Sequence, residues 1–174
     1  MKKEDIINVL EEKHQELFNW LENLPDESWN KGPKGKWTTG QHIEHLVDSI
    51  KKLNQAMSYP KFLLKYKFGT SNRDLRSYKD IAQRYQEKLA TNKERAKKFN
   101  KNVKTPPLKK KKRLLTTLQI QNKKLQHKTN HWKDKNLDNL ILPHPLMGKM
   151  PVREIVMWTA HHTEHHTNTL INKH

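Results

Sequence analysis

Four of the eleven histidines lie in one short run, His161-His162-Thr163-Glu164-His165-His166. At about 100° per residue, His162 and His166 project to the apolar face of a helix, whereas His161 and His165 turn about 100° away, toward the rim. Two imidazoles four residues apart lie one helical turn from each other, so both can bind one metal ion. The run therefore predicts two metal ligands, His162 and His166.

A third ligand has to come from another helix, because metal sites in helical bundles are built from facing helices. The chain contains no cysteine, so only imidazole and carboxylate ligands are available. His42 and His45 both fall in the N-terminal half of the second predicted helix. His42 lies about 70° and His45 about 130° from the centre of that helix's apolar face, and either could serve. The alternative is that the histidines only solvate the surface or cap the core.

Helical periodicity and proline breaks define the elements that must position these residues. No segment shows the alternation typical of a half-buried strand. Core helices are predicted over about residues 3–24, 38–59, 109–132 and 151–172, and a more exposed helix over about 78–100. Residues 61–76 and 136–149 are expected to be irregular. The fold class is therefore all-α: a four-helix bundle with an additional exposed lysine-rich helical segment, in a single domain over residues 1–174.

One further histidine, His14, falls on the apolar stripe of the first helix, four residues from both Leu10 and Phe18. We expect a buried, neutral histidine that is hydrogen-bonded to a neighbour. The alternative is a role beside the metal.

The charge balance is strongly basic, with 35 Lys and Arg against 18 Asp and Glu and a net charge of +17. Such an excess can indicate nucleic acid as a partner. The lysines are spread along the chain and outnumber arginine, the better residue for bidentate phosphate contacts, so a lysine-rich surface is the preferred interpretation. No apolar run approaches the ~18 residues of a membrane span, and the first residues contain no apolar signal core. We expect no membrane partner and a cytoplasmic location.

Two segments resemble the DinB-like (DinB/YfiT) superfamily. The stretch from Gly35 to Leu46, GKWTTGQHIEHL, is similar to the Trp-Ser/Thr start of that family's second helix. There, a histidine followed by leucine, eight positions after the tryptophan, is a metal ligand. That position is His45, and the H-x-x-x-H pair of the family's last helix matches His162 and His166. The resemblance thus implies the metal ligands His45, His162 and His166, with His42 as the substitute for His45. Thr169 stands where the family often has glutamine.

Three neutral imidazoles would leave a divalent ion such as Zn2+, Ni2+ or Fe2+ with open positions for water or substrate. The resemblance implies transfer of a low-molecular-weight thiol, as in the bacillithiol S-transferases of the superfamily, or metal-assisted hydrolysis of a small molecule, in a protein that is often a homodimer. Thr159 and Thr163 could position the substrate or could simply fill the helix. The competing hypothesis is a non-catalytic basic protein that binds an anionic partner such as nucleic acid, and a third is a stress-response interaction module.

Overall fold

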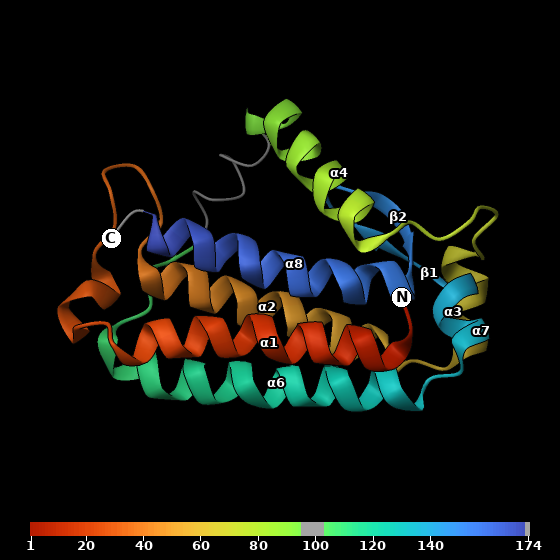
Figure 1. Ribbon diagram of the computed structural model, residues 1–174, viewed down its shortest axis with the longest axis horizontal. Coiled ribbons are helices and arrows are strands. Elements are labelled where there is room, and N and C mark those ends of the chain that lie inside the picture. The colour runs from red at the N-terminus through yellow and green to blue at the C-terminus, as the bar shows by residue number, and fades with distance from the viewer. Residues whose placement is uncertain (95–102, 173–174) are drawn as a thin grey trace.

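Four long helices lie side by side in the computed structural model, which describes residues 1–94 and 103–172 (Figure 1). They are α1 (Lys3–Glu22), α2 (Thr39–Ala56), α6 (Lys111–His131) and α8 (Val152–Ile171). Both α1 and α2 pack against both α6 and α8, which closes the bundle. The predicted all-α four-helix bundle is confirmed.

The bundle is held together by one apolar core to which every long helix contributes. Each helix has buried apolar residues at helical spacing, which is the pattern that drives amphipathic helices to pack. These include Ile6, Leu10, Leu17 and Leu21 of α1, Ile43, Leu46 and Ile50 of α2, Leu118 and Leu125 of α6, and Val152, Val156 and Leu170 of α8. Fully burying one such side chain stabilises the fold by about 1.5–3 kcal/mol.

The start of α2 is fixed by a capping box. The Thr38 hydroxyl accepts a hydrogen bond from the Gln41 backbone N–H at 3.3 Å, and the Gln41 side chain accepts one from the Thr38 N–H at 2.9 Å. These bonds satisfy backbone donors that the first turn of a helix leaves without partners. The helix therefore begins close to the predicted start at about residue 38, and this sets the direction of His42 and His45.

Residues 61–76 were expected to be irregular, but the first half of this segment is helical. After Pro60 it forms a short helix, α3 (Lys61–Phe68), in which only Leu64 is buried. The helix packs on strand β1 (Ile141–His144). Eight residues with a single buried side chain carry too little periodicity to identify a helix from sequence, since tertiary contacts supply most of the stability of short helices.

The prediction for residues 136–149 was also wrong. Helix α7 (Asp134–Asn139) leads into β1, which pairs antiparallel with β2 (Gly148–Pro151). The strands have only four residues each, and Pro143 interrupts the first, so no alternation could reveal them. The turn uses Gly148 at φ 78°, a conformation that favours glycine. This hairpin, α3 and α7 gather at one end of the bundle (Figure 1).

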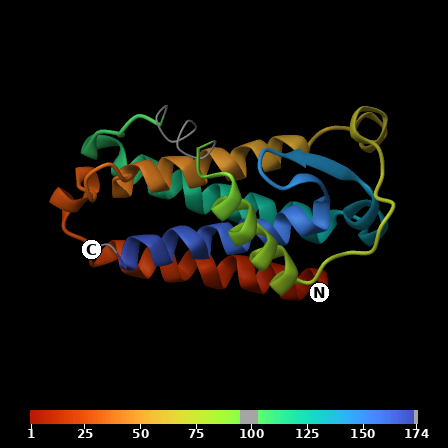
Figure 2. The ribbon, with the colours of Figure 1, turned by 90° about the horizontal axis from the view of Figure 1, so that it is seen from above.

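Helix α4 (Tyr78–Thr91) crosses obliquely over α8 (Figure 2). It is less exposed than its thin apolar stripe suggested, because Ile81 and Tyr85 are buried against the bundle. Residues 95–100 of the predicted helix lie outside the described residues. Short 3-10 turns, η1 (Asp26–Asn30) and η2 (Leu108–Lys110), complete the other connections. Within residues 1–94 and 103–172, no helix combines the length and apolar character needed to cross a membrane.

Candidate metal centre

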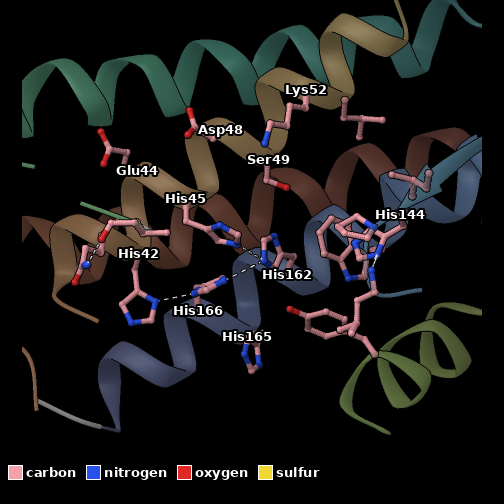
Figure 3. A pocket seen from close by; sticks show the side chains of 18 of the residues that line it. His42, Glu44, His45, Asp48, Ser49, Lys52, His144, His162, His165 and His166 are labelled. Atoms are coloured by element: carbon pink, nitrogen blue, oxygen red, sulfur yellow. Dashed lines mark hydrogen bonds between the residues drawn. The ribbon is translucent and has the colours of Figure 1, made fainter. Parts of the chain in front are cut away.

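The structure brings together three of the histidines that the sequence singled out. His45 of α2 and His162 and His166 of α8 each offer one ring nitrogen, and these nitrogens all lie within 4.8 Å of one another. The Nε2 atom of His162 lies 3.0 Å from Nε2 of His45 and 3.0 Å from Nε2 of His166. Figure 3 shows the three rings turned toward one another from the two facing helices.

This spacing fits a divalent ion. An ion about 2.0–2.1 Å from each nitrogen separates tetrahedral ligand nitrogens by about 3.3 Å, so the rings need to move by only small amounts. The three residues could therefore hold a metal ion.

The protein environment keeps these imidazoles neutral, which is the form that binds metal. Burial lowers the pKa of His162 and His166 well below the ordinary value, and the neighbouring histidines lower both further. Burial, followed by the positive charge of Lys52, lowers the pKa of His45 to about 4. At neutral pH all three rings thus have a lone pair available for a ligand bond.

His42 lies one layer behind this group, in contact with His166. Its Nδ1 atom lies 2.7 Å from Nδ1 of His166, on the opposite side of the His166 ring from Nε2. If Nε2 of His166 binds a metal, its Nδ1 must carry the proton and can donate it in a hydrogen bond to Nδ1 of His42. His42 therefore orients a ring of the cluster and does not replace His45 within it.

Two tryptophans pack against the imidazoles. Trp158 stacks on His162 with ring centroids 4.3 Å apart and planes at 20°. Trp37 is nearly parallel to His166 at 6.0 Å and meets His42 edge-on at 5.3 Å. Trp158 was not predicted to belong to the site, although its position four residues before His162 places it on the same helix face. These rings restrict the orientation of the histidines.

The histidine cluster opens onto a cleft of about 1800 Å³, formed by α2, α8, α3, α4, the hairpin and the segment 103–110. Tyr85 of α4 and His144 of β1 reach this cleft, and neither was predicted from the sequence. Burial lowers the pKa of His144 to about 4, and its Nδ1 accepts hydrogen bonds from the backbone N–H groups of Leu146 and Met147, which holds the hairpin turn. A small molecule could therefore reach the cluster from one side.

The remaining predicted residues lie outside the cluster. His161 is buried, because α4 covers it, and its ring contacts Gln86 and Glu164. His165 is half-buried beside the cleft. Thr159 and Thr163 are buried and donate their hydroxyl hydrogens to backbone carbonyls of their own helix at 2.9 and 3.2 Å. The two threonines therefore fill the helix and do not face a substrate.

His14 is the isolated core histidine that its position in α1 predicted. It is 1% exposed, and its Nδ1 donates to the Leu10 carbonyl at 2.8 Å. Burial lowers its pKa to about 4, so it is neutral at pH 7.

Comparison with known proteins agrees with this arrangement. The sequence model of the DinB superfamily matches residues 10–170. The chain belongs to the DinB superfamily. The match includes both helices that supply the histidines, α2 and α8. No curated protein and no solved structure matches the chain. Family membership together with the three-histidine cluster is compatible with a metal-binding protein.

Proposed function

We propose that this DinB superfamily protein is a metal-dependent enzyme in which His45, His162 and His166 hold one divalent ion, Zn2+, Ni2+ or Fe2+. The ion would activate a thiol or a water molecule for transfer to, or hydrolysis of, a small molecule. The observation that carries the proposal is the convergence of three Nε2 atoms at the wall of an open cleft. A closed structural site needs four protein ligands, whereas three leave a position for a reactant.

When bound, a divalent ion lowers the pKa of a coordinated water or thiol toward neutrality and so supplies a nucleophile. The protein's part is to keep the imidazoles neutral and fixed in orientation. The Nδ1 atom of His42 contacts Nδ1 of His166 and holds that ring, and Trp158 restricts the orientation of the His162 ring by stacking on it. In a transfer reaction the thiol loses its proton, its sulfur forms a bond to an electrophilic carbon, and the leaving group departs with the electron pair of the broken bond. In hydrolysis, water takes the place of the thiol.

A reaction assay tests the proposal. A low-molecular-weight thiol and an aryl halide or epoxide are incubated with metal-loaded protein, with chelator-treated protein, and with metal-treated His162→Ala. We expect thiol consumption above the uncatalysed rate only in the first, and we expect a parallel ester or amide panel to show the same dependence if water is the nucleophile. His127→Ala, at an exposed position on α6 that does not line the cleft, is the control and should keep the activity. A rate that persists after metal removal and in His162→Ala would contradict a metal-dependent reaction.

A further inference from the structure

One stripe of α2 runs from the histidine cluster along the cleft wall. At about 100° per residue, Ser49 lies about 40° and Lys52 about 20° from the direction of His45, so the three side chains share one face. All three line the cleft. Figure 3 shows the Lys52 side chain running back toward the His45 end of the helix, the direction in which helical side chains lean.

The acidic residues of the same helix, which the structure describes in full, form no ion pair with Lys52. Asp48 lies one turn before Lys52 and about 40° from its direction, and Glu44 lies about 80° from it. Within residues 1–94 and 103–172, no carboxylate forms an ion pair with Lys52, which is exposed. The Lys52 ammonium thus faces the cleft with its charge uncompensated by a direct partner.

The cleft as a whole is also basic. Five lysines line it against two carboxylates, Glu44 and Asp48; the lysines are Lys36, Lys52, Lys67, Lys104 and Lys110. Of these lysines, Lys52 lies on the same helix as His45, seven residues and about 10 Å along the helix axis from it. A hydroxyl lies between them at Ser49, which is half-buried and can donate to an anion.

We infer that Lys52 and Ser49 form an anion-binding subsite, so that the small-molecule substrate carries a carboxylate or a similar anionic group within about two helical turns of its reacting atom. This inference rests on the proposed metal-dependent function, because the histidine cluster defines where the reacting end lies. A single ammonium with a neighbouring hydroxyl suits one compact anion. It does not provide the forked donors that favour bidentate recognition.

Binding of simple thiols to Co2+-loaded protein tests the subsite without any turnover. A thiol that ligates Co2+ produces a sulfur-to-metal absorption band, and its titration gives a dissociation constant. The probes are 3-mercaptopropionate with its neutral match 3-mercapto-1-propanol, and 6-mercaptohexanoate with 6-mercapto-1-hexanol. The proteins are the natural sequence, Lys52→Gln, and Lys51→Gln, which removes the same charge from an exposed neighbour that does not line the cleft.

At low ionic strength we expect the carboxylate thiol of at least one length to bind about three- to fivefold more tightly than its alcohol, the range of a solvent-accessible ion pair. Lys52→Gln should remove this preference and Lys51→Gln should retain it. Two results would overturn the subsite and leave the proposed metal function standing. One is equal binding of the carboxylate thiol and its alcohol. The other is a preference for the carboxylate that survives in Lys52→Gln, because the carboxylate then ligates the metal itself. Failure of the protein to bind Co2+ would overturn the proposed function, and the subsite with it.

Discussion

Replacing His42 tests whether the histidine behind the three-histidine cluster is needed for metal binding. His42 is 5% exposed and its Nδ1 lies 2.7 Å from Nδ1 of His166. In His42→Phe a planar ring remains to pack against Trp37, but the acceptor for the His166 N–H is lost. In His42→Asn the amide oxygen can take about the place of that Nδ1 and accept the same hydrogen bond.

The expected cost follows from the role of the hydrogen bond. Removing a partner that orients a metal-binding histidine weakens metal affinity by about 10- to 100-fold. This corresponds to about 1.4–2.7 kcal/mol of binding free energy. His42→Asn should recover most of the loss. His165→Phe, the same exchange on the neighbouring half-buried histidine of α8, should bind metal within about twofold of the natural protein, because His165 is outside the cluster.

Zinc affinity is measured by competition with a chromogenic chelator at pH 7.5, and circular dichroism verifies that each variant is folded. A folded His42→Phe protein that binds zinc as tightly as the natural sequence would refute the orienting role. Equal losses in His42→Phe and His165→Phe would also refute it, because the effect would then not depend on the His42–His166 contact.

Three further predictions concern stability. Burial lowers the pKa of His14 to about 4 from its ordinary 6.5, so between pH 6.5 and 4 the unfolded chain binds a proton that the folded chain does not. The free energy of unfolding should therefore fall on acidification, with His14 accounting for about 2 kcal/mol between pH 7 and pH 5. Urea unfolding of metal-free His14→Leu should show a correspondingly smaller pH dependence. An unchanged pH dependence would contradict the role of His14. Glu154 is 0% exposed and accepts hydrogen bonds from the Arg73 guanidinium at 2.6 and 2.7 Å and from the Arg76 backbone N–H at 2.8 Å. Glu154→Gln should lower the free energy of unfolding by about 2 kcal/mol, which is less than for a fully buried ion pair because the arginines are partly exposed. The same exchange at the exposed residue Glu22 should have little effect. Equal effects of the two substitutions would contradict a stabilising role of the Glu154 ion pairs. A Cβ atom at Gly40 would lie 2.9 Å from both the Trp29 ring and Pro106 Cγ. Gly40→Ala should therefore lower Tm, despite the higher helix propensity of alanine. A raised Tm would show that Trp29 and Pro106 move aside without cost.

The bundle could be predicted because each long helix carries its own signal. The stripe of α1 and the capping residue Thr38 are local features, and both helices begin close to the predicted residues 3 and 38. Helix α3 and the β1–β2 hairpin depend instead on contacts with distant parts of the chain. The β1 strand pairs with β2, packs on α3 and follows a bridge between Thr70 and Leu140, none of which four residues can reveal.

The candidate site was only partly accessible from the sequence. Spacing alone identified His162 and His166, which do converge. For α2, distance from the apolar centre ranked His42 ahead of His45, whereas the structure places His45 in the cluster and His42 behind it. The reason is that the cluster lies at the edge of the core, where a cleft meets it, so the cluster member on α2 is the half-buried histidine and not the more deeply buried one. The resemblance to the family's register supplied His45. No local pattern could show that α4 would cross α8 and bury His161.

Elemental analysis of the untagged protein tests the central claim most directly, because a histidine tag would add ligands to the eleven histidines already present. Protein purified without chelators should contain about one divalent ion per chain. Folded His45→Ala, His162→Ala and His166→Ala should each lose that ion, while His14→Leu should keep it. Natural protein that holds no ion after incubation with Zn2+, Ni2+ or Fe2+, or triple-alanine protein that holds as much as the natural sequence, would contradict a metal centre at these three histidines.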